Sequence, residues 1–143
     1  MIKFISSEDT LAIRSPVLRD GAASHLCIFD GDDDELSFHL GYFIDDELVC
    51  VASFHKQERE GFSGLGYQLR GMATIFAQQG KGIGNQLVNF SIVYLRGQKA
   101  NYIWCNARKV AFTFYSGLGF EFISEEFDIP KIGPHRSMYL KIQ

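Results

Sequence analysis

The sequence contains few cysteines and no long apolar run, and both absences limit what the protein can be. Its three cysteines, Cys27, Cys50 and Cys105, are an odd number without CxxC spacing. This pattern argues against a disulfide scaffold and favours a reducing compartment. No apolar stretch approaches the roughly 20 residues of a membrane span, and the N-terminus lacks the apolar core of a signal peptide. We therefore expect a soluble, cytoplasmic protein that does not act in a membrane.

The chain also lacks an excess of positive charge. Its formal net charge is −3, so nothing in the composition indicates a nucleic-acid partner. Hydrophobic residues make up 46% and charged residues 22% of the sequence, a balance that argues against disorder. With 143 residues, the chain has the length of one domain and can bury roughly 70% of its unfolded surface. We expect a single domain over residues 1–143.

Apolar periodicity predicts strands that alternate with helices. The predicted strands are Ile2–Ile5, Phe38–Ile44, Leu48–Phe54, Tyr67–Ile75, Tyr102–Cys105, Phe120–Ser124 and Ser137–Ile142. The predicted helices follow a cap at Ser6 or Ser7, run from Ile83 to Gly97, and cover residues 110–118 before Gly119. Asp45-Asp46 indicates a hairpin, and residues 128–135, with two prolines, indicate a connector. The order β-α-β-β-β-α-β-α-β-β indicates an α/β or α+β domain with a mixed sheet.

A glycine-rich turn, Gln79–Gly84, lies between a predicted strand and a predicted helix. Its sequence is QGKGIG. Glycines allow backbone N–H groups to approach an anion, and the helix N-terminus adds unpaired donors and partial positive charge. Lys81 could add a direct charge. The spacing fits neither a Walker motif nor a dinucleotide-binding fingerprint. The residues alone leave two interpretations open, a phosphate site and a helix entry whose glycines serve packing.

Two segments, residues 72–84 and residues 111–120, together resemble the GCN5-related N-acetyltransferase (GNAT) superfamily. The first, residues 72–84, is similar to the [RQ]-x-x-G-x-[GA] segment of that family after an apolar strand end. The second, residues 111–120, is similar to its Ala-x-x-x-Tyr-x-x-x-Gly-Phe helix. The resemblance covers about residues 65–123. It implies a mixed, mostly antiparallel, twisted sheet of six to seven strands flanked by helices, with a splay between the two central strands. It also implies acetyl-CoA as co-substrate.

The resemblance assigns roles to individual residues. Main-chain groups that would pair with the pantetheine arm belong to Met72, Ala73 and Thr74. Amides that would hold the pyrophosphate belong to Gln79, Gly80, Lys81, Gly82, Ile83 and Gly84. Tyr115 matches the general acid that protonates the departing thiolate, whereas periodicity alone would make it a core aromatic residue. Many members carry an asparagine seven residues before this tyrosine; here Arg108 stands there, and Asn106 could serve instead or be an ordinary turn residue.

Other polar residues leave alternatives open. Relatives that acetylate amines often place a carboxylate before the pyrophosphate turn, but Tyr67–Arg70 contains none. The general base could be a water relay, His55 or Glu58, or be absent if the amine arrives neutral. Arg70 suggests an anionic group on the substrate, or is a solvated strand residue. The acidic run Asp30–Glu35 could attract a cation, or is a solvated loop. The histidines lack metal-ligand spacing, so we expect no metal.

The sequence thus favours an N-acetyltransferase that transfers an acetyl group from acetyl-CoA to a primary amine of a small molecule or peptide. The amine would attack directly in a ternary complex. The alternative from another class is a non-catalytic acyl-CoA-binding regulatory module, which the missing carboxylate favours. A third interpretation is a nucleotide-binding protein of another kind. Dimers are common in the GNAT superfamily, so the resemblance also allows a homodimer.

Overall fold

The computed structural model describes residues 1–143. The strands are β1 (Ile2–Ile5), β2 (Phe38–Ile44), β3 (Glu47–Lys56), β4 (Gly66–Thr74), β5 (Tyr102–Arg108), β6 (Glu121–Phe122), β7 (Phe127–Ile129) and β8 (Gly133–Lys141). The α-helices are α1 (Ser7–Leu18), α2 (Ile83–Gly97) and α3 (Phe112–Gly117), and the 3-10 helices are η1 (Ser24–Leu26), η2 (Phe76–Gln78) and η3 (Lys109–Ala111). None of the helices combines the length and the apolar character needed to cross a membrane.

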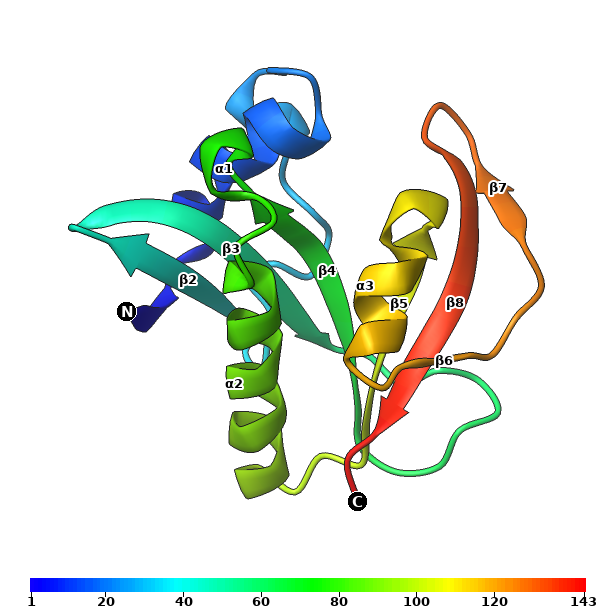
Figure 1. Cartoon of the computed structure of the whole chain (residues 1–143). Helices are drawn as coiled ribbons and strands as arrows, with labels where there is room; N and C mark the ends of the chain where they lie inside the picture. Colours follow the sequence, from blue (N-terminus) through cyan, green and yellow to red (C-terminus); the bar gives the residue numbers. More distant parts are fainter. The chain divides into compact units, whose positions relative to one another are not determined.

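The eight strands are hydrogen-bonded in the order β1-β2-β3-β4-β5-β8-β6, and β7 pairs with β8 (Figure 1). Pairs β1–β2, β2–β3, β5–β8, β6–β8 and β7–β8 are antiparallel, whereas β4 and β5 are parallel. The predicted fold class, a mixed and mostly antiparallel sheet flanked by helices, is confirmed. The sheet has eight strands rather than six or seven.

The additional strand arises where the sequence predicted a connector. Residues 128–135 include the end of β7 and the start of β8, which form a hairpin. The turn is tight because Lys131 and Gly133 adopt φ values of 69° and 114°. Pro134 lies at the second position of β8, near the strand start, where a proline is tolerated. The prediction of an irregular connector was therefore wrong for both ends of this segment.

The helix predicted over residues 110–118 is shorter than expected. Strand β5 continues to Arg108, the 3-10 turn η3 follows, and α3 begins only at Phe112. Val110, expected on the apolar face of this helix, is 92% exposed. The apolar spacing overestimated the helix because Val110 belongs to a turn that contributes nothing to the core.

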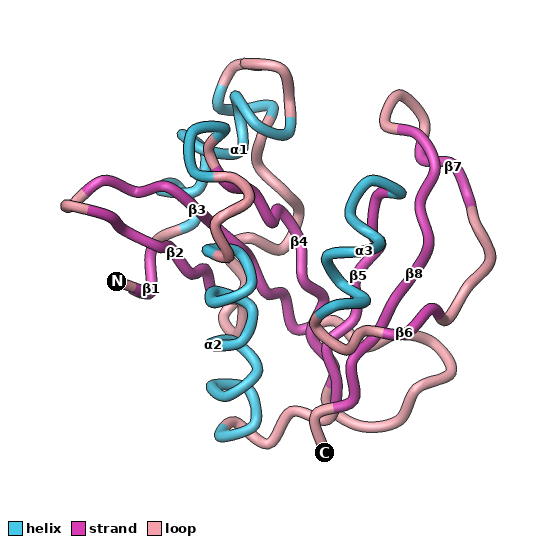
Figure 2. The backbone as a smooth tube through the Cα atoms, viewed as in Figure 1, coloured by secondary structure: helices cyan, strands magenta, loops and turns pink.

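The chain packs as two compact units, Met1–Lys56 with Leu69–Ser91, and Gln57–Gln68 with Ile92–Gln143. Strand β4 and helix α2 run through both units. Figure 2 distinguishes the helices, strands and loops of the chain by colour. The expectation of a single domain over the whole chain stays a prediction.

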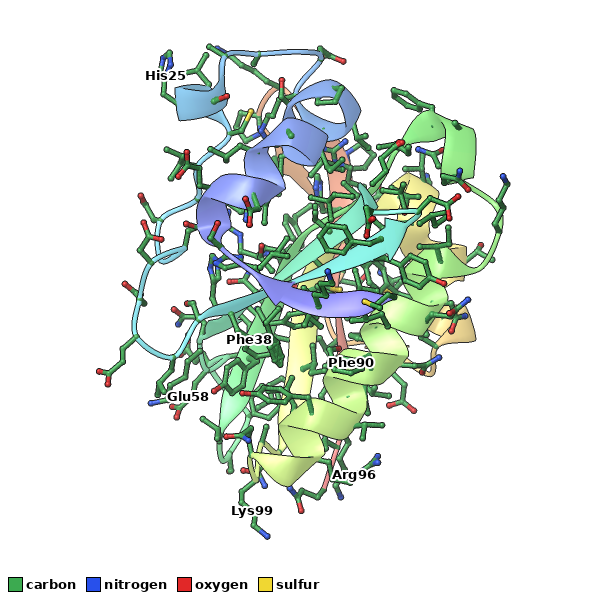
Figure 3. All side chains as sticks on the ribbon, turned by 90° about the vertical axis from the view of Figure 1, so that its left-hand side faces the viewer. His25, Phe38, Glu58, Phe90, Arg96 and Lys99 are labelled. Atoms are coloured by element: carbon green, nitrogen blue, oxygen red, sulfur yellow. The ribbon has the colours of Figure 1, made fainter.

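In the first unit, α1 and α2 cover opposite faces of the strands. Ile13 of α1 packs with Val51 and Ala73. Phe4 instead lies 5.8 Å from Phe38 and 6.1 Å from Phe90 of α2, measured between ring centroids. Figure 3 labels both Phe38 and Phe90, the latter on α2. Strand β3 buries apolar residues on both faces, because successive side chains point to opposite sides.

In the second unit, β8 is the central strand because it pairs with β5, β6 and β7. A long loop, Gln57–Leu65, is tied to β5 by hydrogen bonds from backbone and side chains. Trp104 Nε1 donates to the Gln57 carbonyl oxygen at 2.8 Å, and the Arg59 amide donates to the Tyr102 hydroxyl oxygen at 2.8 Å. These bonds hold the start of the loop against β5.

A buried polar network joins α1, β2 and β3 in the first unit. Arg14 of α1 is fully buried, and its guanidinium forms a bidentate ion pair with Asp32 at 2.7 and 3.0 Å. The same guanidinium donates to the Ser53 hydroxyl oxygen at 2.7 Å. His39 contacts that hydroxyl at 2.6 Å, and His55 lies 3.0 Å from the Asp32 carboxylate. Asp32 is therefore a structural counter-ion and not part of a solvated acidic loop.

The environment of Asp32 keeps its carboxyl ionised. Burial alone would raise the pKa of Asp32, but hydrogen bonds from His55, Arg14 and the Phe29 amide hold this pKa well below its usual range. A carboxyl with a depressed folded-state pKa contributes stability above its unfolded-state pKa, near 4, and loses that contribution as the pH falls further. The first unit should therefore lose stability in acid below about pH 4.

Strand β4 contains a bulge at Gly71. Ala73 packs beside Val51 on the α1 face, so Arg70, three residues earlier, would point to the opposite face in a regular strand. Instead the Arg70 guanidinium lies over Phe29, 4.4 Å from the ring centroid. Because the ring of Phe29 also stacks with Arg14 of α1, Arg70 and Ala73 share one face. One additional residue between them is the mark of a β-bulge.

Gly71 is required at this bulge for two reasons. Its φ of 64° lies in the left-handed region. A Cβ atom there would also lie 2.8 Å from Cε2 of Phe29 and 3.1 Å from Nε of Arg14. Both neighbours are buried, so neither can move away without a cost.

The network predicts a large effect of Asp32→Asn. This variant should lower the free energy of unfolding by about 3–5 kcal/mol at pH 7, because it leaves the Arg14 charge buried and unpaired. Urea unfolding followed by circular dichroism measures the change. Asp34→Asn is the matched control, since Asp34 is exposed in the same loop, and its effect should stay within about 0.5 kcal/mol. Equal effects of the two variants would contradict the structural role of Asp32.

The bulge predicts that Gly71→Ala destabilises the fold by about 2–4 kcal/mol, through left-handed strain and the clash with Phe29. Gly21→Ala separates the two effects, because Gly21 has a φ of 79° and a Cβ added to it would meet no atom within 4 Å. It should cost only about 1 kcal/mol. Thermal and urea unfolding of both variants provide the comparison. If the two glycines respond alike, Phe29 does not constrain the bulge.

Candidate active site

The backbone of β4 has one edge without a strand partner beyond the bulge. Its parallel pairing with β5 covers only Gly66–Gln68, and no β5 residue pairs with Leu69–Thr74. A strand edge without a partner presents N–H and C=O groups that an extended ligand can join. The predicted pantetheine contacts, Met72, Ala73 and Thr74, lie in this part of the strand.

The glycine-rich turn after η2 presents a run of unpaired amides. The backbone N–H groups of residues 80–85 donate no hydrogen bond within the protein, and the first helical bond of α2 runs from Gln86 N–H to the Gly82 carbonyl oxygen at 3.1 Å. Gly80 and Gly82 have φ values of 77° and 79°, and a Cβ on either would meet no atom within 4 Å. The turn is thus open to a ligand, and its donors at the start of a 15-residue helix suit a diphosphate.

Side chains of the turn lie beside these amides without covering them. The Gln79 side chain donates from Nε2 to the Thr74 carbonyl oxygen at 2.9 Å. Lys81 is exposed, and its ammonium donates to Gln78 Oε1 at 3.2 Å. Ile83 is 5% exposed and anchors the first turn of α2. Of the residues predicted to hold a pyrophosphate, Gly80–Gly84 present unpaired amides at the start of α2, whereas the Gln79 N–H donates to the Phe76 carbonyl oxygen at 3.4 Å.

Tyr115 of α3 belongs to the second unit. The side chain is buried, with Phe114 and Phe120 at 5.0 and 5.3 Å between ring centroids. These edge contacts fix the ring on the helix, as a core aromatic residue would be fixed. The ring of Tyr115 can therefore pack in the core while its hydroxyl is held in a fixed position, because a phenol combines an apolar ring with a polar end.

Asn106 of β5 also belongs to the second unit. Its Oδ1 accepts a hydrogen bond from the Ser137 hydroxyl at 2.7 Å, and the residue is exposed. Ser137 is opposite Asn106 in the β5–β8 register. This bond orients the amide and leaves its Nδ2 donor without a partner in the protein. Asn106 is thus a strand residue with one available donor and not part of a turn.

The candidates for a general base occupy unlike environments. His55 is buried, and its Nε2 is engaged with Asp32 at 3.0 Å, which favours a structural role. Glu58 is exposed in the long loop of the second unit, where Figure 3 labels it. Neither His55 nor Glu58 therefore has the environment expected of a general base that is held at an open strand edge.

The buried cysteines are poor nucleophiles. Burial raises the pKa of Cys50 to about 11, although the Thr74 hydroxyl lies 3.2 Å from its sulfur. Burial also raises the pKa of Cys105 far above its usual range. Since the thiolate is the reactive form, neither residue suits an acyl-cysteine intermediate at neutral pH. Cys105 is only 2% exposed, in the strand predicted over Tyr102–Cys105.

Sequence reasoning missed two residues that shape this region. Gly71 lies in a segment predicted as a regular strand, although an isolated glycine in a strand often marks a bulge. Asp32 is one acid among several in the run DGDDDE. Nothing local distinguishes Asp32 from its neighbours, because its partner Arg14 is 18 residues away.

Comparisons with known proteins place the chain in a family. The model of the acetyltransferase (GNAT) domain matches residues 30–132. The uncharacterized N-acetyltransferase YitI of Bacillus subtilis (strain 168) is 38% identical over 139 residues, which cover 96% of this chain and 93% of YitI.

Solved structures show the same fold. An aminoglycoside 6′-N-acetyltransferase complexed with coenzyme A has a TM-score of 0.74 at 16% identity, with 100% of this chain and 97% of that chain covered. Escherichia coli ElaA has a TM-score of 0.77 at 16% identity, with 97% and 98% covered. The family match and the relative at 38% identity go further than the fold. The chain belongs to the GNAT acetyltransferase family and is an acetyl-CoA-dependent N-acyltransferase.

Proposed function

We propose that this chain binds acetyl-CoA along β4 and the glycine-rich turn, with the pyrophosphate on the amides of residues 79–84. The observation that carries the proposal is the run of unpaired N–H groups at residues 80–85. Met72, Ala73 and Thr74 would pair with the pantetheine arm through their main chain, for which the Gln79 side chain must release the Thr74 carbonyl. Asn106 would contribute its available Nδ2 donor to the cofactor.

The proposed chemistry is direct transfer within a ternary complex. The amine nitrogen attacks the thioester carbonyl carbon, a C–N bond forms, and the C–S bond breaks. Main-chain N–H at the open part of β4 would polarise the carbonyl oxygen. Tyr115 would donate its phenolic proton to the departing thiolate, and the proton lost by the amine would pass to water. No acyl-enzyme is needed, in agreement with the buried cysteines.

The proposed acceptor is a primary amine of a small molecule or peptide. A homodimer and a cytoplasmic location stay predictions. Three free, buried cysteines support the second of these, because no disulfide contributes to the fold.

Tyr115→Phe should lower kcat by about 10²–10⁴-fold, the usual contribution of a general acid, and leave the Kd for acetyl-CoA unchanged. Coenzyme A release with an amine panel and calorimetric titration measure the two quantities. Tyr139→Phe is the matched control, because the Tyr139 ring packs on Phe62 and its hydroxyl has no hydrogen-bond partner in the protein. Unchanged kcat in Tyr115→Phe would remove the acid role. Binding of acetyl-CoA without release by the wild type for any amine would indicate the regulatory module instead.

Gly82→Ala should raise the Kd for acetyl-CoA at least about tenfold, because the methyl group would stand where the phosphate must approach the amides. Calorimetric titration with acetyl-CoA gives the Kd, and thermal unfolding shows the cost to the fold. Gly61→Ala is the control, since Gly61 also has a positive φ, 91°, and open space around its Cα. If both variants bind acetyl-CoA like the wild type, the pyrophosphate does not lie on this turn.

A further inference from the structure

Three guanidinium groups surround the ring of Phe29 in the first unit. The distances from the guanidinium carbon to the ring centroid are 3.9 Å for Arg14, 4.4 Å for Arg70 and 5.6 Å for Arg19. Only Arg14 has a carboxylate partner, the buried Asp32. The Arg19 guanidinium donates one hydrogen bond, to the Leu18 carbonyl oxygen. The cluster therefore has three guanidinium charges and one paired carboxylate. This local excess of positive charge lies in a chain whose net charge is −3.

Arg70 is the least satisfied member of this cluster. It is half-buried on β4, and its guanidinium donates no hydrogen bond and forms no ion pair within the protein. Burial lowers the pKa of Arg70, and the like charges of Arg14 and Arg19 add to this, while Asp32 and Asp30 act in the opposite direction. A stacked guanidinium keeps its planar fork of N–H donors free for a bidentate oxyanion.

The position of Arg70 along β4 indicates which ligand would bring that oxyanion. In the proposed complex the cofactor runs from the pyrophosphate at residues 79–84 to the thioester near Met72. Arg70 precedes Met72 by two residues, about 7 Å along a strand, on the side away from the glycine-rich turn. The phosphates of coenzyme A therefore lie at the other end of the cofactor site, and the acceptor is the molecule that lies beyond the thioester.

We propose that Arg70, assisted by Arg19, binds an oxyanion carried by the amine acceptor, a carboxylate or a phosphate. The acceptor is then an amino acid, a peptide with a nearby carboxylate, or a phosphorylated amine, and not a purely cationic amine. Phe29 holds the guanidinium in place by stacking, and Gly71 provides the bulge that turns Arg70 toward that ring. The inference rests on the proposed function, because it assumes that the amine and acetyl-CoA meet at β4.

The test compares amines in matched pairs, the proteinogenic amino acids against their carboxamides and phosphoethanolamine against ethanolamine. The readout is the ratio of kcat/KM within each pair, for the wild type, Arg70→Met, Arg70→Lys and Arg96→Met. Arg96 is the control because it is exposed at the end of α2 (Figure 3). We expect at least a tenfold preference for one class of anionic amine in the wild type and Arg96→Met, a loss of that preference in Arg70→Met, and partial retention in Arg70→Lys. Circular dichroism checks that each variant is folded.

A second measurement does not depend on catalysis. The Nε–Hε resonance of Arg70 in the ¹⁵N spectrum should shift on titration with N-acetyl-L-leucine or inorganic phosphate, and stay in place with N-acetyl-L-leucinamide. The compound that shifts the Arg70 resonance shows whether the site binds a carboxylate or a phosphate. The amine pair with the higher kcat/KM ratio should indicate the same anion. Ratios near one in the wild type, or ratios unchanged in Arg70→Met, overturn the inference while the acetyltransferase function stands. If no amine is acetylated and the resonance still shifts, the anion site stands and the proposed function fails.

Discussion

The ion pair between Arg14 and Asp32 is the contact on which the first unit depends. Both side chains are buried, so the carboxylate balances a charge that solvent cannot reach. The Asp32 carboxylate also accepts the Phe29 amide at 2.9 Å, which fixes the ring beside Gly71. The bulge of β4 and the position of Arg70 follow from that ring. A loop of acidic residues thus determines the shape of the strand along which the cofactor is proposed to bind.

The proposed cofactor contacts are almost entirely main-chain groups. Every residue except proline supplies an N–H group, so such a site restricts the sequence only where a Cβ would intrude or where φ must be positive. Gly80 and Gly82 meet the second condition, a positive φ, and the pairing of β4 with β5 ends before Met72 without requiring a particular side chain. A chain can therefore keep the fold of distant relatives at 16% identity while the side chains around the acceptor differ.

The features that the sequence predicted correctly are local ones. Ser6 forms the expected cap with Asp9, Asp45 and Asp46 adopt the positive φ values of a hairpin turn, and α2 has the expected bounds. The features that it did not predict depend on partners far along the chain. Asp32 is special only because α1 brings Arg14 to it, and no neighbouring residue signals this. The glycine-rich turn itself was predictable, because its residues are contiguous in the sequence.

The absence of a carboxylate on β4 and the presence of Arg70 have one physical explanation if the acceptor carries an oxyanion. A carboxylate base at that position would repel the acceptor, whereas a guanidinium attracts it. The acceptor's own anionic group would also raise the pKa of its ammonium. An ion pair between that group and Arg70 would offset this rise. The second guanidinium, Arg19, would lower the pKa of such an ammonium, because a like charge disfavours the charged form. Such an amine would lose its proton to water more readily, and the proposed site around Phe29 would supply part of what a general base otherwise provides.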